Sequence, residues 1–128
     1  MNTTIEEEFI KKYIDKGYQE RLLLELGSAK RRTKALSRFS HNAEDVLNKN
    51  IFKKTITNLA DIKENNQTLY VISWDENDGT QTSFTDAIKY CEAAYTSVVL
   101  IGKTFALIKE ETEGGTPKIF YLKSNELH

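Results

Sequence analysis

The stretch Thr96–Lys109, TSVVLIGKTFALIK, decides the fold of this chain. Valine, isoleucine, leucine, phenylalanine and threonine dominate it, and these side chains fit a pleated sheet. The stretch predicts two β-strands, Ser97–Ile101 and Thr104–Lys109, joined by a tight turn at Gly102-Lys103, with glycine at the first position of a type II′ turn. The alternative, one turn of a buried helix, is disfavoured by the β-branched residues and the glycine. The first strand does not alternate, so both its faces are expected to be covered.

The residues on either side of this hairpin extend the sheet and supply a helix. Residues 68–74 alternate as a strand, with odd-numbered positions on one face and even-numbered positions on the other. The three strands from residue 97 onward are joined by short loops and are therefore expected to be antiparallel. The other predicted elements are a strand at Thr68–Trp74, a turn at Asp75–Gly79, a helix from the Ser83 cap to about Ala94, a turn at Glu113–Pro117, and a last strand at Lys118–Lys123.

The N-terminal third predicts helices. Thr3 or Thr4 can cap a first helix whose first turn is acidic, as the helix dipole favours. A second helix is expected over Tyr18–Leu26 and a third, capped by Ser28, from Ala29 to about His41, followed by a short helical turn through Leu47. Residues 48–67 leave two interpretations open, a connecting segment or an edge strand followed by a helical turn.

Composition limits the class of protein. The chain has 128 residues, of which 39% are hydrophobic and 29% are charged, as in an ordinary globular domain. We expect a single α+β domain over residues 1–128, with a helical part at 1–47 and a β-rich part at 68–123. The expected architecture is N-terminal helices packed on a mostly antiparallel sheet of about four strands with one intervening helix. The absence of a long apolar run, of a signal sequence and of a second cysteine favours a cytoplasmic protein without a membrane span.

Sequence motifs for catalysis, metals and cofactors are lacking. The two histidines, His41 and His128, and the single Cys91 do not have the spacing of zinc ligands. Cys91 falls on the predicted buried stripe of its helix, which favours a core residue over a nucleophile. Each of the six glycines is explained by a cap or a turn, and no phosphate-binding loop is present. We therefore expect a protein that is not an enzyme and needs no cofactor or metal.

Charge is unevenly distributed, although the formal net charge is only −1. From Ser28 to His41 there are five basic residues and no acidic one, whereas from Asp61 to Tyr95 there are seven acidic residues and two lysines. At about 100° per residue, the basic side chains of the third helix fall in one stripe beside an apolar face that also contains Arg32. This stripe consists of Lys30, Arg31, Lys34, Arg38 and His41, and it could bind phosphates, pair with the acidic half of the chain, or be solvated.

The acidic segment offers a different candidate. Carboxylates beside asparagine and glycine are ordinary in turns, but a cluster of them next to exposed aromatic side chains suits the docking of a basic protein. The predicted partner-binding patch consists of Trp74, Asp75, Glu76, Asp78 and Asp86, with Tyr70 as a further aromatic residue at its edge.

Residues Tyr70–Leu122 resemble small bacterial proteins with a strand ending in an acidic Asp-Gly turn, then a helix, then two strands separated by Gly-Lys. Such proteins are similar to immunity proteins encoded beside polymorphic or contact-dependent growth inhibition toxins. The resemblance implies a toxin-neutralising protein whose partner is a toxin. The acidic patch would attract a basic nuclease among such toxins. A nucleic-acid-binding regulator using residues 29–41 is the alternative, and an enzyme ranks third. The matching stretches are YVISWDENDG (70–79), FTDAIKYCE (84–92), IGKTFALIKEE (101–111) and KIFYLK (118–123), together with KGYQERLLLELG (16–27) and KRRTKALSRFSHN (30–42).

Overall fold

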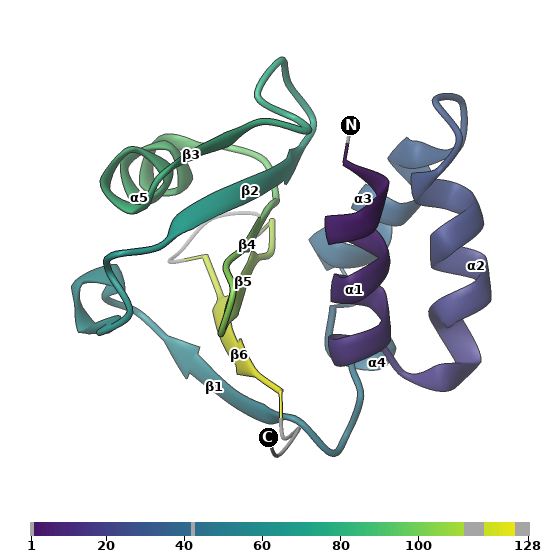
Figure 1. The fold of residues 1–128 in the computed structure, drawn as a ribbon, viewed down its shortest axis with the longest axis horizontal. Helices are drawn as coiled ribbons and strands as arrows, with labels where there is room; N and C mark the ends of the chain where they lie inside the picture. The colour runs from purple at the N-terminus through teal and green to yellow at the C-terminus, as the bar shows by residue number, and fades with distance from the viewer. Residues whose placement is uncertain (1, 42, 112–116, 125–128) are drawn as a thin grey trace.

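A computed structural model describes residues 2–41, 43–111 and 117–124 of the protein. It shows an α+β fold in which helices lie on both faces of one sheet (Figure 1). The helices are α1 (Thr3–Tyr13), α2 (Lys16–Leu26), α3 (Arg32–His41), α4 (Ala43–Val46) and α5 (Phe84–Ala93), with a 3₁₀ turn, η1, at Leu59–Asp61. The strands are β1 (Phe52–Ile56), β2 (Thr68–Ser73), β3 (Gln81–Ser83), β4 (Val98–Ile101), β5 (Ala106–Lys109) and β6 (Ile119–Lys123).

The sheet is antiparallel in the order β1-β6-β5-β4-β2-β3. Within the described residues it has six strands, so the expectation of about four was wrong. The segment 48–67 contributes β1 as an edge strand, which was one of its two interpretations. Strand β3 was not predicted, because three residues directly before a helix are too few to show a β pattern. The antiparallel order of β4, β5 and β6 is confirmed.

The central hairpin is confirmed, but its turn is longer than predicted. Ile101 pairs with Ala106, so four residues, 102–105, form the loop. Gly102 does not have a positive φ, since among the described residues only Gly79, in the Asp75–Gly79 turn, does. Glycine is favoured at 102 for another reason: an added Cβ would lie 2.6 Å from Gln67 Oε1 and 3.0 Å from Leu69 Cδ2, so these side chains would have to shift.

Two cores share the sheet. On one face α1 to α4 pack on Tyr70, Ile72, Val99 and Ile108, with Phe9 and Phe39 fully buried among them. On the other face α5 and η1 cover Leu69, Val71, Leu100 and Leu107. Figure 1 shows α1–α4 on one side of the sheet and α5 on the other. The alternation predicted for residues 68–74 is confirmed, and every residue of β4 is buried from both sides.

The helix boundaries shift by a few residues from the predictions. Asn2 caps α1 by accepting a hydrogen bond from the Ile5 N–H, in place of Thr3 or Thr4. α2 begins at Lys16 after the Asp15 cap, and α3 begins only at Arg32, because residues 28–31 form a turn closed on the Ser28 carbonyl. Ser83 caps α5 as predicted. The predicted turn at 113–117 lies almost wholly outside the described residues.

Candidate protein-binding surface

The end of β2 presents an exposed aromatic side chain. Trp74 follows the last residue of the strand and is 40% exposed. Its indole Nε1 donates a hydrogen bond to Ser97 Oγ at 3.0 Å, and the buried Ser97 hydroxyl also contacts Ser40 Oγ at 2.5 Å. The polar edge of the indole is therefore fixed on the helix-sheet interface while part of the ring remains available to a partner. Amphipathic rings held in this way are common anchors at protein interfaces.

Asp75 is held in a defined orientation beside Trp74. One of its oxygens accepts hydrogen bonds from Ser73 Oγ and the Asn77 N–H, both at 2.9 Å, and the other accepts from the Tyr90 hydroxyl at 2.7 Å. Partial burial opposes ionisation, but the hydrogen bonds from Tyr90, Asn77 and Ser73 outweigh it and lower the pKa of Asp75 below its ordinary value. Burial and the neighbouring carboxylate raise the pKa of Tyr90 to about 12. A fixed carboxylate therefore lies at the surface.

These residues border a shallow hollow of about 430 Å³. Its rim is formed by the end of β2, the last turn of α5 and the segment that leads to β4. Tyr95, which the helical spacing of the sequence places on the same buried stripe as Cys91, is instead 99% exposed there, because α5 ends before it. The side chains around the hollow belong to Trp74, Asp75, Tyr90, Ala93, Ala94, Tyr95 and Thr96. We call this set, with the adjacent exposed Glu76, the Trp74 surface.

Asp78 does not belong to the exposed patch in which the sequence placed it. Its carboxylate is directed into the molecule, where Asp78 Oδ2 lies 2.6 Å from Arg32 Nε and Oδ1 lies 2.9 Å from Arg32 Nη2. The sequence placed Asp78 with the exposed turn acids, and no local signal indicated a partner 46 residues away. Asp86 is exposed in the first turn of α5, one helical turn before Tyr90, and does not border the hollow.

Arg32 is the centre of a buried ionic cluster. Its guanidinium also donates to both oxygens of Glu6, at 2.9 and 2.7 Å, and to the Leu26 carbonyl at 2.9 Å. Burial disfavours the charged guanidinium, but the bonds to Glu6 and Asp78 outweigh it and raise the pKa of Arg32. The Tyr70 hydroxyl donates to Glu6 Oε2 at 2.5 Å, and burial and this contact raise its pKa to about 12. Tyr70 is thus buried and does not border the predicted patch.

The predicted basic stripe is only partly exposed. Arg38 makes two hydrogen bonds to Glu25, at 3.0 and 2.9 Å, and His41 Nε2 lies 3.7 Å from Glu111. Lys30 and Arg31 precede α3, and with Lys34 they are exposed. These three make no salt bridge within the described ranges. The structure therefore leaves three of the five predicted cations available at one end of α3.

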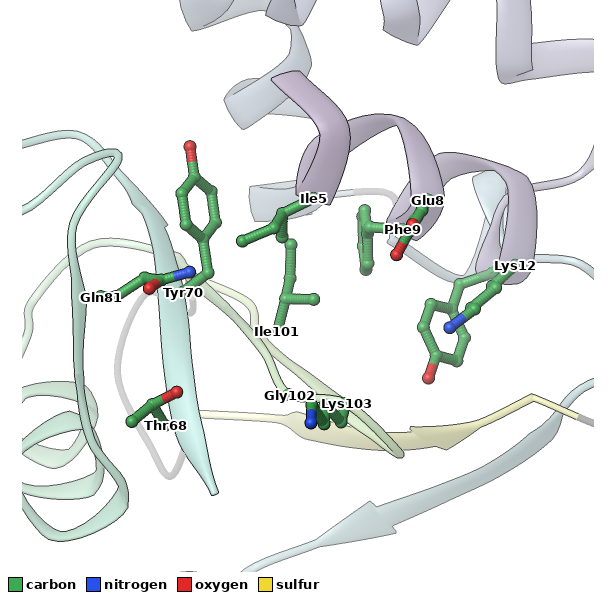
Figure 2. A pocket seen from close by; sticks show the side chains of 11 residues that line it. Ile5, Glu8, Phe9, Lys12, Thr68, Tyr70, Gln81, Ile101, Gly102 and Lys103 are labelled. Atoms are coloured by element: carbon green, nitrogen blue, oxygen red, sulfur yellow. The ribbon is translucent and has the colours of Figure 1, made fainter. Parts of the chain in front are cut away.

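A second hollow lies between α1 and the sheet (Figure 2). It has a volume of about 320 Å³ and a largely apolar floor that includes Ile5 and Ile101. Figure 2 shows α1 side chains facing those of β2, β3 and the loop after β4, with Glu8, Lys12 and Lys103 among the polar residues at its rim. The sequence did not predict this groove, because α1 is about 60 residues from β2 and about 90 residues from the loop after β4 along the chain.

No cluster of three potential metal ligands occurs among residues 2–41, 43–111 and 117–124. Cys91 is fully buried in the core beneath α5, as expected, and burial raises the pKa of its thiol to about 11. Within the same ranges no helix has the length and apolar composition needed to cross a bilayer.

Comparisons with known proteins found no matching family model, no similar curated protein and no similar solved structure.

Proposed function

We propose that this protein is a non-enzymatic protein-binding module that engages a basic partner through the Trp74 surface. The observation that carries the proposal is the grouping of two exposed aromatic side chains, Trp74 and Tyr95, with the fixed carboxylate of Asp75 and the exposed Glu76 around one hollow. Aromatic anchors in desolvated pockets supply most of the binding energy at interfaces, and surrounding charges steer association.

The kind of partner that best fits this surface is a basic toxin domain, so the specific proposal is a toxin-neutralising immunity protein. It rests on the sign of the surface and on the resemblance of residues 70–122 to immunity proteins. A nuclease that binds phosphate backbones is positively charged around its active site. A protein that covers that site with aromatic and acidic groups would compete with the nucleic acid and would associate quickly at low salt.

The experiment uses the toxin-like protein encoded next to the gene, purified as a catalytically inactive variant. Association is followed by stopped-flow tryptophan fluorescence at low and high salt. Reversing two charges, Glu76→Lys with Asp86→Lys, should slow association about tenfold at low salt and flatten its salt dependence. The matched control is Glu20→Lys on α2, an exposed position on the far side of the helical layer, which should leave the rate nearly unchanged.

Truncating the aromatic anchors tests the same surface by dissociation. Tyr95→Ala should weaken binding by about tenfold or more through faster dissociation, since hot-spot truncations cost more than about 1 kcal/mol. Tyr95 is almost completely exposed, so its removal should leave the unfolding midpoint unchanged. If the tight complex forms equally well in Tyr95→Ala and in the charge reversal, the Trp74 surface is not the interface. A neighbouring gene for a metabolic enzyme, with no toxin that binds, would oppose the immunity assignment.

The second candidate is a nucleic-acid-binding regulator, favoured by the three exposed cations at the start of α3. Lys30, Arg31 and Lys34 could contact phosphates, which predicts weak and strongly salt-dependent binding. A gel-shift assay with DNA and RNA in low salt distinguishes the two functions. Retardation that is lost in a Lys30→Glu, Lys34→Glu double variant would favour this candidate, and no retardation of either nucleic acid would dismiss it.

A further inference from the structure

Strand β1 is an open edge of the sheet. Among the strands that the structure describes it is the outermost, and there it pairs with β6 alone, from Phe52↔Lys123 to Ile56↔Ile119. Within the described chain, no other backbone hydrogen bond involves residues 52–56. Four of its five residues are exposed. The opposite edge, β3, has three residues and leads directly into α5 through the Ser83 cap. The long edge that could accept another strand is therefore β1 (Figure 1).

An apolar groove lies beside this edge. It has a volume of about 390 Å³, and Phe52, Ile56, Ile62 and Tyr121 contribute its apolar walls. Phe52 is 49% exposed. Its ring packs edge to face against the Tyr121 ring, with 6.3 Å between the two ring centroids. Helix α5 packs mainly on β2 and β3, and none of its residues lines this groove. A strand added to β1 would find an apolar site for its own side chain on this face.

The charge of the edge limits what can occupy it. Between Val46 and Ala60 the chain carries three lysines and no acidic residue. Lys53 pairs with Glu44 at 3.1 Å, but Lys54, on the groove side, makes no salt bridge within the described ranges. Asp61 and Glu64 on the groove rim are partly offset by Lys63 and Lys123, and Glu64 contacts Tyr121 and Lys123.

Pairing of two copies through this edge is disfavoured by the same lysines. An antiparallel arrangement centred on the strand would place Lys54 of one copy opposite Lys54 of the other, and like charges directly opposite each other are destabilising. An extended segment with carboxylates at alternate positions would instead neutralise the exposed ammonium groups. The charge pattern of β1 therefore favours an acidic strand from another protein over a second copy of this chain.

We propose that β1 and the adjoining groove form a docking site for an acidic extended segment of a partner protein. The segment adds to the sheet as a seventh strand, with a carboxylate beside Lys54 and an apolar side chain against Phe52. Three strands, β6, β5 and β4, separate this site from β2, which carries the Trp74 surface. The site is therefore a second interaction surface and does not depend on the proposed function.

The test uses a fluorescein-labelled peptide of nine residues. Threonine, valine and glutamate follow one another along it, and phenylalanine occupies the central position. Two matched peptides carry lysine in place of each glutamate, or proline in place of the central residue. Fluorescence anisotropy should give at least tenfold tighter binding of the acidic peptide than of either matched peptide. A Lys53→Glu, Lys54→Glu double variant should reverse the preference, and Lys89→Glu on the exposed side of α5 should change affinity less than twofold.

Hydrogen exchange of the full-length protein locates the bound peptide. The outward amides of residues 52–56 should exchange more slowly in the presence of the acidic peptide, while those of β3 are unchanged. The proposal is overturned if none of the peptides binds, if the acidic and lysine peptides bind equally, or if protection appears elsewhere. Concentration-dependent dimerisation that protects β1 without any peptide would assign the edge to a second copy and would also overturn it.

Discussion

The side chain of Arg32 links three helices to the turn after β2. It joins α3 to Glu6 in α1, to the Leu26 carbonyl at the end of α2 and to Asp78 in the turn after β2. A buried ion pair contributes little compared with a well-packed apolar replacement, but removal of one partner leaves uncompensated charge inside the protein. Here two carboxylates depend on one guanidinium, so the cluster specifies how the helices dock on the sheet.

Replacing Arg32 by methionine should therefore destabilise the fold strongly. We expect Arg32→Met to lower the free energy of unfolding by about 3–5 kcal/mol, because Glu6 and Asp78 lose their counter-charge. Urea denaturation followed by circular dichroism measures the change. The neighbouring exposed Arg31→Met is the matched control and should change stability by less than about 0.5 kcal/mol. Adding Glu6→Gln and Asp78→Asn to Arg32→Met should recover part of the loss; equal stability of the Arg32 and Arg31 variants would contradict this role.

The ionisation of Asp75 depends on the Tyr90 hydroxyl. Its pKa is lowered in the folded protein, so its contribution to stability is complete above the ordinary aspartate pKa and is lost as the pH falls through the lowered value. Tyr90→Phe removes one donor and should raise the pKa of Asp75 toward its ordinary value. A carbon-13 NMR titration of the aspartate carboxyls measures the pKa of Asp75 in both proteins. Tyr95→Phe is the control, and an unchanged Asp75 pKa in Tyr90→Phe would show that the hydroxyl is not responsible.

At the scale of elements, α5 is attached to the sheet by an unusual C-terminal contact. The Lys109 ammonium group at the end of β5 is 5% exposed and donates to the Cys91 and Ala94 carbonyls at 2.6 and 2.7 Å. The last carbonyls of a helix have no partner within the helix, and the helix dipole favours a positive charge there. The periodicity of β5 could not reveal this, since a lysine at a strand end is normally solvated.

Removing this contact should loosen α5. Lys109→Met keeps the apolar stem but removes the donor from the buried Cys91 carbonyl and the partly buried Ala94 carbonyl, which should cost about 2 kcal/mol of stability. Thermal unfolding measures the loss, and Lys89→Met on the exposed side of α5 is the control with little expected effect. The Cys91 thiol gives a second readout: its reaction with a thiol reagent should be faster in Lys109→Met than in the wild type, and an identical rate would argue against loosening of α5.

The strands show where local patterns are sufficient. β2, β4, β5 and β6 are rich in apolar residues, and their boundaries were predicted to within two residues. β1 has only one buried residue, so its amphipathic pattern is weak and its pairing with β6 is decided by long-range contact. The loop length after β4 also depends on distant groups, because Gln67 accepts a hydrogen bond from the Lys103 N–H at 2.8 Å.

At the scale of the whole molecule, both cores share strands β2, β4, β5 and β6. Odd-numbered residues of β2 face α5 and even-numbered residues face the N-terminal helices. Loss of either helical layer would expose the apolar side chains that these strands direct toward it, so the two layers are expected to unfold together.

Unfolding should therefore be a single transition. Far-ultraviolet circular dichroism, which reports on the helices, and Trp74 fluorescence, which reports on the sheet end, should give the same urea midpoint and slope. The protein has one tryptophan, so the fluorescence signal has one origin. Two distinct midpoints would mean that the helical layer and the sheet are separate cooperative units.

The sequence by itself determined the α+β class, the central hairpin, the alternation of β2 and the burial of Cys91. These features follow from side-chain periodicity and composition within about fifteen residues. The tertiary structure alone decided that Asp78 faces Arg32, that Tyr95 joins Trp74 and Asp75, and that β1 forms an open edge. Each of these depends on segments far apart in the chain, and a periodic pattern shows which face of an element is buried but not which residue lies against it.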